Sequence, residues 1–329
     1  MDSMIIPEYD NSHRAFLQAL LARASWTFEQ ARPILAAISN AHNGNESEVL
    51  PEQITQEIFQ DYIEVASDAA SLFDYEIRST IDQVTKQRMY ALVNTQSDPQ
   101  TQLATIYSAE ELAFIKRVLD GIFDKYNTPR MEVVAITEMQ AIKFAKPPLR
   151  RSEIDLEEST PTDPQSVDRG LKHGEAEAVL KSLVDAGWFS KSQHGFYSLT
   201  ARTILELRPW LLEVYNDAAS GDAWQKVKFC EACKEIVTFG LRCSEPDCVL
   251  RLHDMCQDAF WRARRSKKCP KCDTVWQGNR YVGERAVTET EAYRRGRRRS
   301  GGRRATLADE VIHQTSIDAA AADDDDDDE

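Results

Sequence analysis

Cysteine is absent from the first 229 residues of this 329-residue chain, and all seven cysteines lie between Cys230 and Cys272. That concentration and the odd number argue against a disulfide framework and favour a local metal site in a reducing compartment. No apolar run approaches the roughly 20 residues that a membrane span requires. Residues 1–10 also lack the basic start and apolar core of a signal peptide. We therefore expect no contact with a membrane.

The chain also lacks a glycine-rich phosphate loop and a convincing nucleophile with its base, so the sequence offers no catalytic side chain. The net charge of -14 is uneven, because the last seven residues, 323–329, are all acidic. The rest of the chain is only mildly acidic. With 42% apolar residues, its length suits two or three small domains with linkers.

What the C-terminal third does contain is a complete set of zinc ligands with the spacing C-x2-C-x9-C-x4-C-x4-H-x2-C-x12-C-x2-C. Two residues between ligands let one turn direct both side chains at a single ion, and zinc accepts thiolate and imidazole in a tetrahedral shell. Eight ligands make two closed sites, so two structural Zn²⁺ ions are expected. The ligands are Cys230, Cys233, Cys243, Cys248, His253, Cys256, Cys269 and Cys272.

Spacing alone does not choose between sequential pairing of these ligands and cross-braced pairing. Eight-ligand fingers of this order are known mostly as cross-braced RING and PHD-type fingers. That similarity implies one site of Cys230, Cys233, His253 and Cys256. It implies a second site of Cys243, Cys248, Cys269 and Cys272.

Other residues favour a RING-like finger over a PHD-type histone reader. Lys267 stands where PHD fingers usually carry Trp, and Pro270 gives the Cys-Pro-x-Cys knuckle common in RING ligases. A short helix over residues 258–262 is expected to expose Phe260 and Trp261, where RING fingers dock a ubiquitin-conjugating enzyme.

The N-terminal region is expected to be a winged helix over residues 1–100. Apolar spacing predicts a helix over residues 13–24 and a second one that Pro51 opens. Two strands over residues 75–78 and 89–93 follow, joined by a polar turn.

A second winged helix is expected over residues 101–225. Ser108 and Glu111 form a capping box before one helix, residues 131–144 form another, and residues 175–186 a third. A hairpin around residues 187–198 forms the wing. Residues 147–167, rich in Pro, Glu, Ser and Thr, are expected to be a flexible insertion. The fold class is mainly α with small β: tandem winged helices, a RING-like finger over residues 226–277 and a disordered tail over 278–329.

Charge argues against DNA binding by the first winged helix. Between Asn40 and Ile77 there is no Lys or Arg but there are nine acidic residues, and phosphate contact needs cations. A protein-binding role is the better interpretation. The second unit is modestly basic at Arg169, Lys172, His173 and Lys181. Two interpretations of these residues stay open, a weak DNA contact and a solvated helix face. The tract Arg294–Arg304 suits a nuclear localisation signal or a nucleic-acid contact; the alternative is a solvated tail.

Two winged helices followed by a C4HC3 finger resemble non-SMC element one, the RING-like subunit of the SMC five–six chromosome-maintenance and DNA-repair complex. The finger carries the resemblance together with short stretches at residues 13–18, 90–94, 178–180 and 187–189. The resemblance implies a nuclear subunit that pairs through its winged helices with a MAGE-type non-SMC subunit. It also implies a kleisin-type subunit and SMC ATPases as partners.

The resemblance further implies a RING-type ubiquitin-protein ligase, with Ala232, Phe260, Trp261 and Pro270 as candidate docking residues for the conjugating enzyme. Two positions depart from strong ligases: Ala232 replaces the usual Ile or Leu, and Asp273 stands where a cation is common. Activity is therefore expected to be weak alone and stimulated by the partner. The alternatives are a purely structural zinc subunit, a histone reader and a winged-helix transcription factor.

Overall fold

The computed structural model describes residues 9–44, 48–95, 106–148, 168–216, 224–264, 266–299 and 307–314. The chain divides into two compact units. Unit 1 contains residues 1–99 and 200–209, and unit 2 contains residues 100–199 and 210–329. None of the helices in the described ranges is long and apolar enough to cross a membrane.

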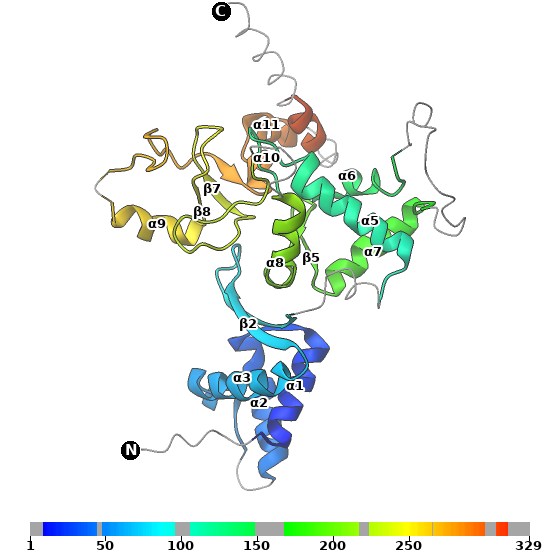
Figure 1. Cartoon of the computed structure of the whole chain (residues 1–329), viewed down its shortest axis with the longest axis vertical. Helices are drawn as coiled ribbons and strands as arrows, with labels where there is room; N and C mark the ends of the chain where they lie inside the picture. Colours follow the sequence, from blue (N-terminus) through cyan, green and yellow to red (C-terminus); the bar gives the residue numbers. More distant parts are fainter. Residues whose placement is uncertain are drawn as a thin grey trace, which may run out of the picture. The chain divides into compact units, whose positions relative to one another are not determined.

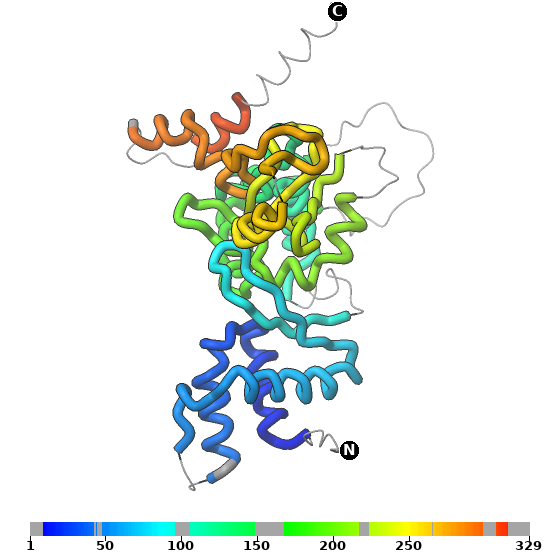
Figure 2. The backbone as a smooth tube through the Cα atoms, turned by 90° about the vertical axis from the view of Figure 1, so that its left-hand side faces the viewer, coloured from blue at the N-terminus to red at the C-terminus, as the bar shows by residue number. Residues whose placement is uncertain are grey.

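Unit 1 is a winged helix (Figure 1, blue to cyan). Its elements run α1 (Asn11–Arg23), β1 (Ser25–Thr27), α2 (Phe28–Asn43), the 3-10 helix η1 (Pro51–Gln53), α3 (Gln56–Ser71), β2 (Tyr75–Ile81) and β3 (Arg88–Asn94). The three strands form an antiparallel sheet in the order β1-β3-β2, and the long helices pack together beside it (Figure 2).

An aromatic cluster fills the core of unit 1. Phe16, Trp26 and Phe59 are at most 1% exposed. The Phe16 and Trp26 rings meet edge to face at 5.4 Å, and Phe59 meets Tyr90 of β3 at 4.9 Å. Edge-to-face pairs add to the free energy gained by burying the rings. The core therefore ties the helices to the wing strand.

The predictions for unit 1 succeeded for α1 and for the β2–β3 hairpin, while two details differ. Helix α2, which has Pro33 inside it, and the short strand β1 were not located from the sequence. Pro51 opens only η1, and the long helix begins after Thr55, whose hydroxyl caps it by accepting the Ile58 N–H.

Unit 2 begins with a second winged helix of the same element order. It comprises α5 (Ala109–Asp120), the π-helical turn η2 (Gly121–Lys125), β4 (Ile136–Thr137), α6 (Glu138–Ile142), α7 (His173–Asp185), β5 (Phe189–Lys191) and β6 (Phe196–Leu199). The sheet order β4-β6-β5 matches that of unit 1. Helix α8 (Ala201–Tyr215) contributes residues to both units.

The predicted helix over residues 131–144 is wrong, because only α6 within it is helical. Residues 131–137 are all buried, and their regular structure is an isolated bridge between Glu132 and Asn127 and the strand β4. They bond to partners distant in sequence: β4 pairs with β6, and the Glu132 carbonyl accepts the Gly283 N–H. Most of the predicted flexible insertion, residues 149–167, lies outside the described residues.

The finger follows with β7 (Gly240–Arg242), β8 (Arg251–Leu252), α9 (Asp254–Arg262), β9 (Tyr281–Val282), α10 (Arg285–Thr288) and α11 (Glu291–Arg299). The sheet order is β8-β7-β9. The prediction of a disordered tail from residue 278 is therefore wrong for residues 278–299. Strand β9 completes the finger's sheet, and Tyr293 of α11 is 1% exposed. Residues 315–329, with the acidic run, lie outside the described residues.

Candidate metal centre

The eight predicted ligands meet in two groups of four. One group contains Cys230, Cys233, His253 and Cys256. The other contains Cys243, Cys248, Cys269 and Cys272, and within each group the ligand atoms all lie within 4.8 Å of one another. The two groups interleave along the chain, so the arrangement is cross-braced rather than sequential. The structure thus selects the pairing that spacing left open.

The distances within each group suit a tetrahedral zinc ion. Zinc–sulfur bonds of about 2.3 Å at tetrahedral angles place two sulfurs about 3.8 Å apart. The Sγ atoms of Cys243 and Cys272 are 3.5 Å apart, as are those of Cys248 and Cys269. A disulfide would require about 2.05 Å, and the cysteines are free. The residues present therefore fit a metal and not a cross-link.

Two knuckles present their cysteines through the same backbone turn. The N–H of Lys234 donates to the Cys230 carbonyl, and the N–H of Asp273 donates to the Cys269 carbonyl, both at 2.9 Å. Lys234 and Asp273 take left-handed φ values of 62° and 58°. This turn places the two thiols of each knuckle on the same side, which is why two intervening residues suffice.

His253 is held in the tautomer that a metal needs. Its Nε2 lies 3.1 Å from the Ile236 carbonyl, to which it donates, while Nδ1 lies 3.3 Å from the Cys233 sulfur. A metal-bound histidine commonly donates its other N–H to a carbonyl in this way. Nδ1 is therefore the ligand atom.

The close approach of several cysteine sulfurs in the first metal group opposes their ionisation, and a bound cation would offset this. Burial would raise the pKa of Cys230, but the neighbouring His253 side chain and hydrogen bonds from backbone amides lower it to about 6. Burial and the neighbouring charges of Cys230 and Cys233 raise the pKa of Cys256 to about 12. Without a divalent cation the group cannot hold all its thiolates ionised at neutral pH.

A buried ion cluster joins the finger to the second winged helix. The Glu132 carboxylate accepts from Arg251 Nε at 2.7 Å and lies 3.1 Å from both Lys228 and Arg242. All four side chains are at most 6% exposed. Burial alone would raise the pKa of Glu132, but hydrogen bonding and charge from Arg251, with Arg242 and Lys228, lower it. Burial lowers the pKa of Lys228 to about 8 against the pull of Glu132.

This ion cluster was not predicted from the sequence. One feature could have revealed it: Glu132 is a lone carboxylate in the apolar run 131–136, and a buried acid is rare unless paired. Its partners flank the metal ligands. The Arg251 carbonyl also accepts the Glu231 N–H at 2.9 Å, next to Cys230. The cluster therefore supports the backbone that carries the first metal group.

The predicted docking residues are not equally accessible. Ala232 and Pro270 are exposed, but Phe260 and Trp261 are 5% and 9% exposed. The expectation that the helix exposes both aromatics is wrong, because each packs on a neighbour. Trp261 lies 5.2 Å from the Trp276 ring, and the Arg264 guanidinium lies 3.5 Å above the Phe260 ring.

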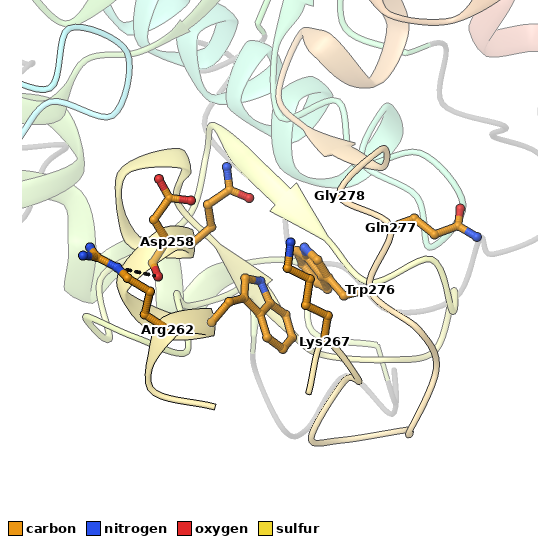
Figure 3. A pocket seen from close by; sticks show the side chains of 8 residues that line it. Asp258, Arg262, Lys267, Trp276, Gln277 and Gly278 are labelled. Atoms are coloured by element: carbon orange, nitrogen blue, oxygen red, sulfur yellow. Dashed lines mark hydrogen bonds between the residues drawn. The ribbon is translucent and has the colours of Figure 1, made fainter. Parts of the chain in front are cut away.

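A groove of about 730 Å³ lies beside α9 (Figure 3). The side chains of Trp261 and Trp276 line it, with Arg262 and Asp258 on the side of α9 and Lys267 next to Trp276. Gln257, Gln277 and Gly278 complete the lining. Trp276 had no predicted role.

The two recognition-helix positions differ in charge. On α3 an exposed stripe carries Glu57, Asp61, Glu64 and Asp68. At α7 the basic side chains have acidic neighbours on the same helix: Lys172 of the N-cap lies near Glu175, His173 near Glu177 and Lys181 near Asp185. This pairing favours the solvated-face interpretation of α7. Neither metal group includes His13, His42, His173, His194 or His313.

Known proteins resemble this chain over most of its length. The family model described as "Nse1 non-SMC component of SMC5-6 complex" matches residues 13–207, and that described as "RING-like domain" matches residues 230–272. The "Non-structural maintenance of chromosomes element 1 homolog" of Rattus norvegicus is 23% identical over 264 residues, 80% of this chain and 83% of that protein. The "Non-structural maintenance of chromosomes element 1" of Schizosaccharomyces pombe is 23% identical over 253 residues, 76% of this chain and 91% of that protein.

The solved structures agree on the fold. A chain of a structure described as "Nse1-Nse3-Nse4 complex" aligns with a TM-score of 0.60 at 20% identity. The alignment covers 82% of this chain and 98% of that chain. At this identity the likeness establishes the fold alone.

Proposed function

This chain belongs to the family of Nse1 non-SMC components of the SMC5-6 complex, and we propose that it acts in the nucleus as a RING-like ubiquitin ligase subunit of such a complex in DNA repair and chromosome maintenance. The observation that carries the proposal is the order of parts: tandem winged helices and a cross-braced finger in one chain.

The first winged helix is proposed to bind protein. The exposed acidic stripe on α3, which comprises Glu57, Asp61, Glu64 and Asp68, would repel a phosphate backbone. The fold neighbour is described as a complex with Nse3 and Nse4. A MAGE-type subunit and a kleisin-type subunit are therefore the proposed partners, and SMC ATPases complete the assembly.

The two groups of ligands are proposed to hold structural zinc. Four protein ligands close each shell, so zinc supplies cross-links that fix the finger and leaves no position for a reacting water. Cys230, Cys233, His253 and Cys256 would hold the first ion, and Cys243, Cys248, Cys269 and Cys272 the second.

In the proposed ligase reaction no side chain of this chain forms a bond to ubiquitin. A substrate amine attacks the thioester carbonyl on the conjugating enzyme, the carbon–sulfur bond breaks, and the enzyme's cysteine leaves as a thiol while an amide forms. The finger contributes by orientation. Ala232 and Pro270 are the exposed docking candidates. Ala232 offers little apolar area for docking, and Asp273 is acidic where a cation is common. We therefore propose that ligase activity is weak in the isolated chain and is raised by the MAGE-type partner.

The test is ubiquitin transfer by the chain with its MAGE-type partner, comparing Pro270→Ala with Pro246→Ala. Both prolines are exposed residues of the finger, but only Pro270 lies in the last knuckle. Transfer is expected to fall several-fold for Pro270→Ala alone. Trp261→Ala is a weaker test, since Trp261 is buried and its loss also disturbs packing. Equal transfer by both proline variants would instead favour a purely structural zinc subunit.

Membership of the assembly is tested separately by purifying the chain from cells and identifying its partners by mass spectrometry. Recovery of SMC-type ATPases is the expected result. Recovery of neither these nor a MAGE-type protein would contradict the proposal whatever the ligase assay gives.

A further inference from the structure

The finger carries a dense basic segment that neither the ligand pattern nor the proposed ligase role uses. Six of the ten residues from 262 to 271 are Lys or Arg, and no acid stands among them. Over residues 226–277 there are eleven Lys and Arg against seven Asp and Glu, in a chain whose net charge is -14. The described cations of the segment are Arg262, Arg264, Lys267, Lys268 and Lys271, which we name the basic knuckle surface.

All five side chains of the basic knuckle surface are exposed. Lys271 lies 3.7 Å from Glu231. Arg262 and Arg264 donate to backbone carbonyls of α9, those of Asp258 and Phe260, and the Arg264 guanidinium also lies 3.5 Å above the Phe260 ring. Within the described part of the chain, the structure gives Lys267 and Lys268 no carboxylate partner. Four of the five positive charges are therefore free of a counter-charge from a carboxylate in the described residues.

The backbone under these cations is fixed. The Trp276 N–H donates to the Lys267 carbonyl at 2.8 Å, and Lys268 forms an antiparallel bridge with Val275. Cys269, which follows directly, belongs to the second metal group. The cations therefore extend from a rigid support, so less conformational entropy is lost when an anion binds.

The groove beside α9 adds neutral donors. Gln257 and Gln277 are among its lining residues; in Figure 3 Gln277 lies beyond Trp276, on the side away from Arg262. Glutamine amides commonly contact phosphate oxygens alongside Arg and Lys. Asp258 is the one acid in the lining. The indoles of Trp261 and Trp276 are 9% and 7% exposed, so they form the floor and offer little ring face for stacking bases.

From this arrangement we propose that the basic knuckle surface binds the phosphodiester backbone of nucleic acid without reading its sequence. A protein ligand fits less well, because lysine is depleted at protein interfaces and this surface offers little exposed apolar area beyond Val275. The proposal does not depend on ligase activity or on membership of the assembly.

The experiment measures fluorescence anisotropy of labelled 30-mers, one duplex and one single strand, with the full-length zinc-loaded chain over a range of KCl. If four phosphates are neutralised, log K against log salt should have a slope of about -3.6 for the duplex. The variant Lys267→Gln/Lys268→Gln should flatten the slope by about 1.8 and weaken binding about tenfold or more at 100 mM salt. Comparison of duplex with single strand identifies the preferred form.

The matched control is Lys116→Gln/Lys146→Gln, which removes the same charge from exposed positions elsewhere in unit 2. It should leave the slope unchanged, and both variants should retain their zinc. Four outcomes would overturn the proposal. The first is no binding, and the second is an equal loss of binding in the two variants. The third is binding lost only with Arg297→Gln/Arg298→Gln, which would place the contact on α11. The fourth is an equally tight, equally sensitive interaction with a Glu-rich peptide, which would indicate a protein ligand.

Discussion

Removing the charge of Glu132 should destabilise unit 2 more than any surface charge change. Glu132 is one buried carboxylate facing three buried cations: Arg251, Arg242 and Lys228. The substitution Glu132→Gln keeps the side-chain volume but leaves the three cations without a counter-charge. It also places an amide N–H₂, which can only donate, against the N–H groups of these cations. Breaking a buried ion pair on one side costs about 3–5 kcal/mol. For a unit of this size that corresponds to a fall in Tm of roughly 10 °C.

The assay is calorimetry of the full-length zinc-loaded chain, with zinc release followed by a chromogenic chelator. The control is Asp185→Asn, which removes an acid from the exposed pair with Lys181 and should cost less than about 1 kcal/mol. Because Arg251 supports the backbone at Cys230, Glu132→Gln should also release zinc faster. The reasoning is refuted if Glu132→Gln and Asp185→Asn melt within a degree of each other, or if Glu132→Gln/Lys228→Met is no more stable than Glu132→Gln alone.

Three further predictions concern the zinc sites, the last knuckle and the unit 1 core. Chelation of zinc should unfold the finger, since each structural zinc contributes on the order of 10 kcal/mol to folding. The expected result is a change in the fluorescence of Trp261 and Trp276 that added zinc reverses. Unchanged fluorescence after full loss of zinc would contradict the prediction. Asp273→Arg should raise partner-stimulated ubiquitin transfer at a stability cost of about 1 kcal/mol, because Asp tolerates the left-handed φ of 58° better than Arg; a Lys234→Arg control should leave transfer unchanged. Phe59→Ala should destabilise unit 1 by about 3–5 kcal/mol, because the ring is fully buried. It should also weaken binding of the MAGE-type partner in pull-downs. Phe73 is exposed, so Phe73→Ala should leave the thermal unfolding of unit 1 unchanged.

The ligand positions could be predicted from the sequence because their chemistry is local. Short spacings such as that from Cys269 to Cys272 are satisfied by a single turn, whatever surrounds them. Pairing between knuckles depends on distant backbone, so spacing could not choose the group that joins Cys243 to Cys272. The capping box of Ser108 and Glu111 was equally local, and the structure contains it.

The errors arose where tertiary contacts override local pattern. Residues 131–136 form an apolar run that could suit a helix, but they are all buried, and the pairing of β4 with β6 holds Ile136 in a strand. Phe260 and Trp261 were expected to be exposed because Trp276, which covers one of them, is distant from α9 in sequence. The arginine-rich composition predicts disorder after residue 278. In the structure, however, β9 pairs with β7 and forms an edge strand of the finger's sheet.

The return of the chain through β9 has a consequence for protein engineering. A segment cut at residues 226–277 would leave β7 without β9 and the three cations without Glu132. Such a fragment should not fold as an independent domain on another scaffold, even though it contains both sets of metal ligands. The smallest transplantable piece must carry the loop around Glu132 and continue through Gly283, so the finger and the second winged helix are inherited together.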